Sequence, residues 1–294
     1  MSENNLVNLD IGDFHSKAKT IIQELQKVIV GQEALIHDLM VTLCAGGNAL
    51  LEGVPGLGKT MLVRTLSEVV ECSFNRIQFT PDLMPADIVG TMIISEGADG
   101  RRGFVFDRGP VFAHLLLADE INRATPRTQS ALLEAMQEQM VTVAGVTYPL
   151  PKPFFVLATQ NPIEMEGTYP LPEAQLDRFL YKIDVPYPEE DELVEIARRT
   201  TGRSLPAVNH VTNADSLAAM QAMVRDVPVE DRVYRYAARL VSATHPYNEK
   251  APAGIKKNLR VGASPRGIQA LIRAGKVEAF LDNRKAVAIE DIRK

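Results

Sequence analysis

The chain has 294 residues, a net charge of −5 and a hydrophobic content of 46%. This length and apolar content indicate a globular protein with room for one large and one small domain. The acidic balance argues against a dedicated nucleic-acid site, and no apolar run reaches the length of a transmembrane segment. Because the polar start of the chain lacks the layout of a signal peptide, we expect a cytoplasmic protein.

The first part of the chain predicts a helix that ends near residue 30. Apolar side chains recur at approximately helical spacing over residues 21–29, and Gly31 then interrupts the pattern. A glycine at this point is typical of a helix end.

A short apolar strand over residues 48–52 runs directly into the loop Gly53-Val-Pro-Gly-Leu-Gly-Lys-Thr60, of the form G-x-x-x-x-G-K-[ST]. Its glycines let backbone N–H groups point at phosphate oxygens. Lys59 supplies positive charge to the β- and γ-phosphates, and Thr60 offers a hydroxyl to Mg²⁺. The residues that follow predict a helix whose N-terminus favours an anion. A plain glycine turn is the alternative, but the Lys-Thr pair favours an ATP-binding loop.

Two acidic residues follow a second apolar stretch. Residues 111–118 predict a buried strand of a parallel sheet, with His114 inside it as a core histidine, and Asp119 and Glu120 come directly after it. Asp119 is placed to hold Mg²⁺, directly or through water, and Glu120 to orient and deprotonate an attacking water. Two acids after a strand are common by chance, but a preceding phosphate-binding loop favours the catalytic interpretation.

A third strand is predicted over residues 154–159 and is followed by Gln160-Asn161-Pro162. The Asn161 amide can hold a water between Glu120 and the γ-phosphate. An asparagine that begins a turn before proline is the alternative for this residue taken alone. Beside the other two elements, we favour the functional interpretation.

Several ordered motifs together resemble those of the AAA+ ATPases and, within them, the MoxR-type family, which is related to magnesium chelatase ATPase subunits. The motifs are Val30-Gly31-Gln32, residues 78–90, residues 119–124, residues 158–162 and residues 176–179. The resemblance covers nearly the whole chain. It implies an α/β fold, in which a P-loop AAA+ core with a parallel sheet and helices on both faces precedes a small all-helical lid.

The resemblance also assigns roles to the motif residues. Lys59 and Thr60 are similar to the Walker A residues, Asp119 and Glu120 to the Walker B pair, and Asn161 to sensor 1. It implies ATP and Mg²⁺ as cofactors, with Thr60 and Asp119 on the metal. The residues expected to contact the nucleotide are Val30, Gly31, Gln32, Gly53, Pro55, Gly56, Leu57, Gly58, Lys59, Thr60 and Met61.

Two arginines are expected to complete the catalytic set. Arg178 resembles the arginine finger, which reaches the γ-phosphate held by a neighbouring subunit; a surface charge paired with Asp177 is the alternative. Arg266 resembles the sensor 2 arginine, in the first turn of a helix that Ser264 caps and Pro265 begins. A nearby phosphate would offset the unfavourable helix dipole there. Whether Arg266 serves its own subunit's ATP or a neighbour's stays open.

Two hairpins are predicted before the domain boundary. Residues 88–110 contain apolar strands around a polar, glycine-rich tip and resemble the helix-2 insert of MoxR-type ATPases. Residues 141–150 alternate β-branched side chains around Ala144-Gly145, at the position of the presensor 1 hairpin. Either can carry force to a client, and a decorated surface loop is the alternative for both.

The best domain boundary is Val185-Pro-Tyr-Pro188, so we predict a nucleotide-binding core over residues 1–186 and a helical lid over residues 187–294. The chain stops where another helix begins, whereas relatives usually continue, so we expect a shortened lid. The helical patterns in the lid cover residues 191–199, 214–225, 230–244 and 266–280. Cys44, Cys72 and the scattered histidines predict no metal site beyond nucleotide-bound Mg²⁺.

Three functions are compatible with the predicted ATP site. We favour an oligomeric ATPase, a hexameric ring by resemblance, that remodels protein complexes or aids metal-cofactor insertion. A protein client and a von Willebrand-type-domain partner follow from the same resemblance. A nucleic-acid motor is the second function, and the acidic charge stands against it. The third is an ATP-controlled assembly switch with little turnover, against which the set of Glu120, Asn161 and Arg178 argues.

Overall fold

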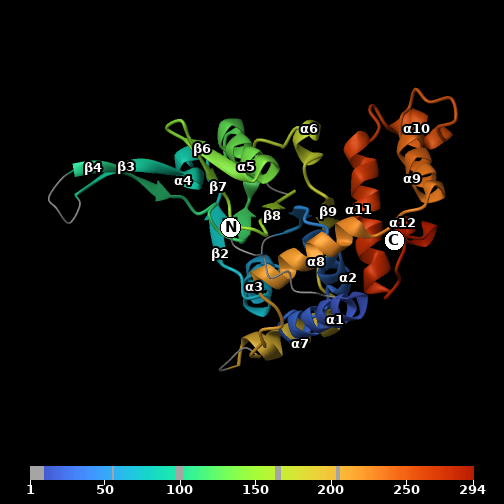
Figure 1. Ribbon diagram of the computed structural model, residues 1–294, viewed down its shortest axis with the longest axis horizontal. Helices are drawn as coiled ribbons and strands as arrows, with labels where there is room; N and C mark the ends of the chain where they lie inside the picture. Colours follow the sequence, from blue (N-terminus) through green and yellow to red (C-terminus); the bar gives the residue numbers. More distant parts are fainter. Residues whose placement is uncertain (1–9, 55, 97–101, 163–166, 203–205) are drawn as a thin grey trace.

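The computed structural model describes residues 10–54, 56–96, 102–162, 167–202 and 206–294. Its centre is a five-stranded sheet (Figure 1). The strand order is β2-β5-β8-β1-β9, with parallel neighbours throughout. The strands of this sheet are β1 (Ala49–Glu52), β2 (Phe74–Gln78), β5 (Leu115–Asp119), β8 (Phe155–Gln160) and β9 (Tyr181–Asp184).

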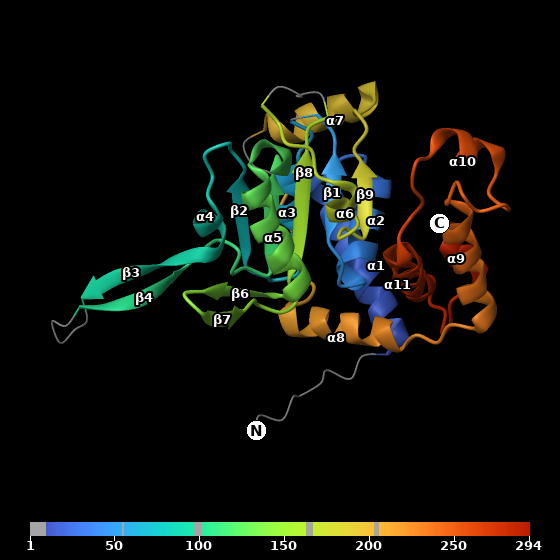
Figure 2. The same cartoon turned by 90° about the horizontal axis from the view of Figure 1, so that it is seen from above.

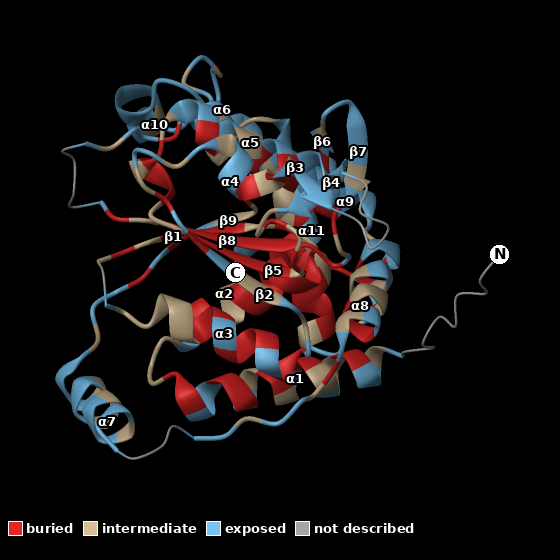
Figure 3. Ribbon diagram, turned by 90° about the vertical axis from the view of Figure 1, so that its left-hand side faces the viewer, coloured by how far each residue is buried: buried red, intermediate tan, exposed pale blue. Residues whose placement is uncertain are grey.

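Helices cover both faces of the sheet (Figure 3). Leu51 and Leu117 point to the face covered by α1, α2 and α3, whereas Leu50 and Leu116 point to the face covered by α4 and α5. These strands are apolar at successive positions because both of their faces are buried. The helices are α1 (Ile11–Val28), α2 (Glu33–Cys44), α3 (Lys59–Val69), α4 (Pro85–Val89), η1 (Ile121–Arg123), α5 (Pro126–Glu138), α6 (Glu173–Leu176), α7 (Glu190–Thr200), α8 (Ala214–Asp226), α9 (Asp231–Ala243), α10 (Ala253–Asn258), α11 (Pro265–Leu281) and α12 (Ile289–Arg293).

The strand predicted over residues 111–118 is shorter than its apolar run. β5 begins at Leu115, and Val111 and Ala113 are buried in the turn before it. The prediction of His114 inside the strand is therefore wrong. His114 is half-buried, and its Nδ1 atom lies 2.7 Å from Oγ of Ser73. A run of apolar residues indicates burial, but it does not by itself indicate an extended backbone.

Hairpins form at both predicted places. The insert hairpin, β3 (Gly90–Glu96) and β4 (Arg102–Arg108), is antiparallel and projects away from the sheet (Figure 2). The second hairpin consists of β6 (Met140–Val143) and β7 (Val146–Pro149). Phe106 of β4 stacks on Tyr148 of β7 with ring centroids 4.2 Å apart, so the two hairpins are in contact at their bases. Residues 97–101 of the predicted tip lie outside the described residues.

The helices after residue 187 do not all lie together. Arg199 near the end of α7 donates to the backbone oxygen of Lys27, 2.7 Å away, which places α7 beside the end of α1. In contrast, α8 and α11 contribute Met220 and Phe280 to the buried cluster that also contains Phe14 of α1. The hydrophobic core thus continues past the predicted boundary at residue 186, whose position stays a prediction.

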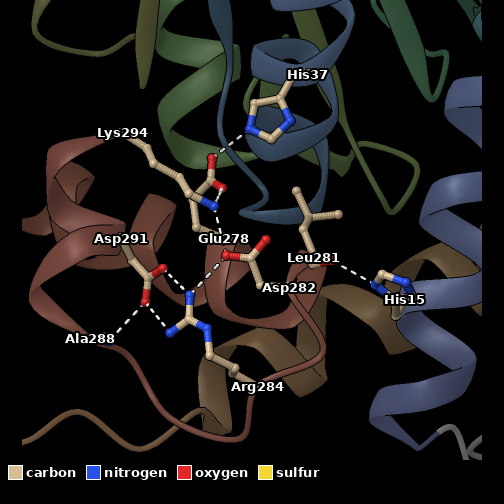
Figure 4. A network of polar contacts seen from close by, with 9 residues as sticks. All are labelled: His15, His37, Glu278, Leu281, Asp282, Arg284, Ala288, Asp291 and Lys294. Carbon is tan, nitrogen blue, oxygen red and sulfur yellow. Dashed lines mark hydrogen bonds and ion pairs between the residues drawn. The ribbon is translucent and has the colours of Figure 1, made fainter.

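A polar network joins the end of the chain to α2 (Figure 4). Glu278 of α11 is 2% exposed. One of its carboxylate oxygens lies 2.6 Å from Nε2 of His37, and the other lies 3.1 Å from Nζ of Lys294. Arg284 and Asp291 form a second ion pair between the end of α11 and α12. Within the described part of the chain, no helix combines the length and apolar character needed to cross a membrane.

Candidate active site

A cavity of about 450 Å³ lies at the carboxyl ends of the central strands. It is formed where β1, β2, β5 and β8 end, because the ends of parallel strands meet at one edge of a sheet. The lining residues are Gly53, Gly56, Leu57, Gly58, Lys59, Thr60, Met61, Arg76, Gln78, Asp119, Glu120, Thr159 and Asn161. The structure therefore brings most of the predicted nucleotide residues together with the predicted acids and Asn161.

The glycine-rich loop has the backbone that its sequence predicts. Gly56 and Gly58 have φ angles of +87° and +74°, in the left-handed region that favours glycine. Apart from its neighbours in sequence, no described residue has an atom within 4 Å of the place where a Cβ on Gly56 would stand, so the space beside this glycine is open. Helix α3 begins at Lys59, directly after Gly58, which turns the first N–H groups of the helix toward the same space. Pro55 lies outside the described residues.

Lys59 is held inside the cavity. Its Nζ atom donates to the backbone oxygen of Gly53 over 2.6 Å. Burial lowers the pKa of Lys59, and the nearby charges of Asp119 and Glu120 oppose that shift. A partly desolvated ammonium group next to open backbone amides can bind a phosphate anion strongly, because solvent screens the charges less there.

The two acids are fixed by the strand beside them. The hydroxyl of Thr159, on β8, donates to Oδ1 of Asp119 over 2.6 Å and accepts from the backbone N–H of Glu120 over 2.8 Å. Glu120 has φ 57° and ψ 48°, a left-handed conformation that is uncommon for a residue with a side chain. This turn ends β5 and keeps the Glu120 carboxylate at the cavity. Asn161 lies at the end of β8 and is 6% exposed.

Three polar contacts to these acids were not predicted from the sequence. Arg76 and Gln78 are two residues apart on β2. Arg76 donates a hydrogen bond to Asp119, and Gln78 donates one to Glu120. Nη1 of Arg123 lies 3.0 Å from Oε2 of Glu120. In the sequence, the spacing of two places Arg76 and Gln78 on the same side of the strand. Only the order of the strands in the sheet shows that this side lies next to the acids at the end of β5.

Three predicted adenine residues do not line the cavity. Val30, Gly31 and Gln32 connect α1 to α2, and both Gly31 and Gln32 have positive φ angles. A Cβ on Gly31 would stand 2.1 Å from a carboxylate oxygen of Glu192 on α7, so a side chain there would have to displace Glu192. Because the Glu192 side chain is flexible, the positive φ of Gly31, +64°, is the stronger reason for a glycine at this position.

Arg178 and Arg266 line a second cavity, of about 1170 Å³, and no described residue lines both cavities. Asp177 accepts from the Ser264 hydroxyl over 2.6 Å and lies 3.9 Å from Nη1 of Arg266. Arg178 is half-buried, and its Nε atom has no hydrogen-bond partner among the described residues. As predicted, the side chain of Ser264 caps α11 and Pro265 begins it.

Comparison with known proteins defines the class of the chain. Residues 48–181 match the model of the ATPase family associated with various cellular activities (AAA), and residues 253–294 match the model of the AAA lid domain. The solved structure of a candidate ATPase from Cytophaga hutchinsonii is similar with a TM-score of 0.89 and 43% identity, over 96% of this chain and 85% of that one. The fold and the cavity therefore define an ATPase of the AAA class.

Similar curated proteins show to which family of AAA ATPases the chain belongs. Chaperone MoxR1 of Mycobacterium tuberculosis is 44% identical over 280 residues, which are 95% of this chain and 73% of the relative. YeaC of Bacillus subtilis is 41% identical, over 95% of this chain and 84% of the relative. Protein MoxR of Methylorubrum extorquens is 30% identical, over 96% of this chain and 85% of the relative. The chain belongs to the MoxR family of AAA+ ATPases.

Proposed function

We propose that this protein hydrolyses ATP with Mg²⁺ in the cavity at the ends of β1, β5 and β8, and that it works as an oligomer that remodels protein complexes. The observation that carries the proposal is the convergence of Lys59, Asp119, Glu120 and Asn161 on one cavity with an open glycine loop. The cytoplasm is the compartment that we propose, from the sequence.

The loop amides and Lys59 bind the β- and γ-phosphates. The Thr60 hydroxyl and the Asp119 carboxylate suit Mg²⁺, which takes oxygen ligands and keeps other positions for phosphate and water. The metal would supply charge stabilisation at the phosphoryl group. Glu120 orients and deprotonates the attacking water, and Asn161 positions it. In this proposal Val30, Gly31 and Gln32 lie near the adenine, for which their resemblance to the family is the support.

We further propose that Arg178 and Arg266 both serve the ATP of a neighbouring subunit. Their cavity is separate from the one that contains Lys59 and Glu120. Buried polar atoms in proteins are nearly always hydrogen-bonded, and the Nε atom of Arg178 is buried without a partner among the described residues. An anion from a second copy would satisfy the guanidinium once this side chain turns outward. A complete catalytic site then needs two subunits, which favours a closed ring, and we propose a hexamer.

The work of the ATPase is proposed from its relatives and its hairpins. The relative from Mycobacterium tuberculosis is named a chaperone, and we extend a chaperone-like role to this chain. Ile94 and Phe104, paired across the insert hairpin, are 65% and 73% exposed, and apolar side chains of this kind suit a protein client. Assistance in metal-cofactor insertion and a von Willebrand-type-domain partner remain part of the proposal.

A mixing experiment tests the shared site. Glu120→Gln removes the proposed base but leaves the finger, and Arg178→Ala removes the finger but leaves the base. Each variant alone should turn over almost no ATP, and a mixture should recover part of the wild-type rate. Arg198→Ala is the matched control, because Arg198 is 74% exposed on α7 and lies away from both cavities.

The outcomes separate the candidate functions. Recovery in the mixture, with a rate per subunit that rises with protein concentration, supports an oligomeric ATPase with a finger acting between subunits. Full activity of Arg178→Ala would overturn the finger. Absence of turnover in the wild type at every concentration favours the assembly switch, and turnover stimulated by DNA with strong salt dependence favours the motor.

A further inference from the structure

The edge strand β2 directs two polar side chains at the two acids of the cavity. Nη2 of Arg76 donates to Oδ2 of Asp119 over 2.6 Å, and its Nε atom donates to the same oxygen over 3.2 Å. Two residues further on, Nε2 of Gln78 donates to Oε2 of Glu120 over 2.8 Å. Arg76 also donates to the side-chain oxygen of Gln78 over 2.7 Å, which joins both contacts into one unit.

Both oxygens of Asp119 are therefore engaged inside the protein. Oδ1 accepts from the Thr159 hydroxyl, and Oδ2 accepts from Arg76. Among the described residues that line this cavity, the other cation is Lys59, which donates to the backbone of Gly53. The Asp119 carboxylate suits a divalent cation, and Arg76 supplies a positive charge at the same place.

We propose that Arg76 is a positioning residue that pairs with Asp119 and competes with Mg²⁺ for its carboxylate, so that the arginine has to leave before Asp119 can serve the metal. This inference rests on the proposed binding of Mg²⁺ and nucleotide in the same cavity. A cross-strand ion pair that only stabilises the β2–β5 register is the competing explanation. The two differ in what they predict for metal-free and metal-bound nucleotide.

Removal of Arg76 has opposite effects on the two ligand forms if the arginine competes with the metal. Without it, Mg²⁺ meets a carboxylate that has lost its ion pair and binds at a lower concentration. A metal-free nucleotide, which is strongly anionic, meets a cavity with one positive charge fewer and is repelled. A purely structural pair would instead weaken both forms together, because it would act through the shape of the cavity.

The test measures binding of an N-methylanthraniloyl-labelled ADP, which is not turned over, by fluorescence. Wild type and Arg76→Ala are titrated with the nucleotide in EDTA, and then with MgCl₂ at fixed nucleotide. The Arg76 side chain is 45% exposed, so solvent screens the pair, and we expect changes of about fivefold. The half-saturating MgCl₂ concentration should fall about fivefold, and affinity in EDTA should weaken by about the same factor.

Three further variants keep the result decisive. Arg76→Gln removes the charge but keeps a polar side chain of similar shape. It should show the shifts expected for Arg76→Ala, and it replaces that variant if the alanine protein folds poorly. Arg76→Lys keeps the charge and should restore most of the wild-type behaviour. Arg64→Ala, which breaks an exposed ion pair with Glu68 on α3, is the matched control and should change neither value.

Weaker binding of both forms, seen as a rise in the half-saturating MgCl₂ concentration together with a loss of affinity in EDTA, overturns the role of Arg76. No change in either value, where the wild type responds to MgCl₂, overturns it as well. Absence of nucleotide binding by the folded wild type would instead overturn the proposed function, and the inference with it. Thermal unfolding of each variant confirms that the comparison is made between folded proteins.

Discussion

The contact between Phe14 and Phe280 tests whether the sheet and the C-terminal helices form one cooperative unit. Phe14 lies on α1 and Phe280 on α11; they are 0% and 4% exposed, and their rings meet edge to face with centroids 5.2 Å apart. Truncation of either ring to alanine should cost about 3–5 kcal/mol, from lost burial and the cavity left behind. The direct ring contact accounts for about 1 kcal/mol of each loss, so the double variant should fall short of additivity by about that amount.

Urea unfolding followed by circular dichroism measures these costs for Phe14→Ala, Phe280→Ala and the double variant. We expect one cooperative transition, whose midpoint falls for both single variants, because the buried cluster is continuous across the two helices. Phe104→Ala is the control; its ring is 73% exposed on the insert hairpin, and its loss should change stability by less than about 0.5 kcal/mol. Two transitions, of which Phe280→Ala shifts only one, would refute the continuous core.

Three further predictions concern other parts of the fold. The hydrogen bond to Glu278 raises the pKa of His37 above its ordinary value of 6.5, against the effect of burial; the stability lost in His37→Gln should be largest below that value and disappear as the pH rises through the raised pKa. Urea midpoints measured from pH 5.5 to 9 check this, and a loss independent of pH contradicts it. Tyr148→Ala removes the stack on Phe106 and should speed amide exchange in β3 and β4 while β1 stays protected, whereas uniform acceleration would contradict local anchoring. Burial raises the pKa of Cys44 to about 12, so a disulfide reagent should label it only after unfolding; rapid labelling of Cys44 in the native protein would contradict its burial.

Local motifs made much of the fold and the site predictable from the sequence. The glycine loop, the acids at 119 and 120 and Asn161 each follow a short apolar strand, and parallel strands place such ends together. The pairing of Arg76 with Asp119 was not predictable, because it depends on β2 lying next to β5, and the two residues are far apart in the chain. The extent of β5 was misjudged for a different reason, since Val111 and Ala113 are buried in a turn.

The packing of the C-terminal helices was also beyond the sequence pattern. Helical periodicity predicted α7, α8, α9 and α11 within a few residues of their observed bounds, but it carries no information about which helix each one contacts. Tertiary packing divides them, so that α7 lies beside α1 while α8 and α11 enter the main core. The separation of Arg266 from the cavity of its own subunit likewise follows from this packing.

The continuous core limits how the molecule can move. Helix α11 carries Arg266 in its first turn and packs its later turns against α1, so a swing of the whole helix would open this core. In the proposed ring each subunit then moves as a rigid body, and nucleotide-dependent motion takes place at the interfaces between subunits. The insert hairpin is paired from Gly90 to Glu96, a ribbon of roughly 20 Å at the usual rise per residue. A small rotation at an interface between subunits would displace the far end of this hairpin more than its base, because the displacement grows with distance from the axis of rotation.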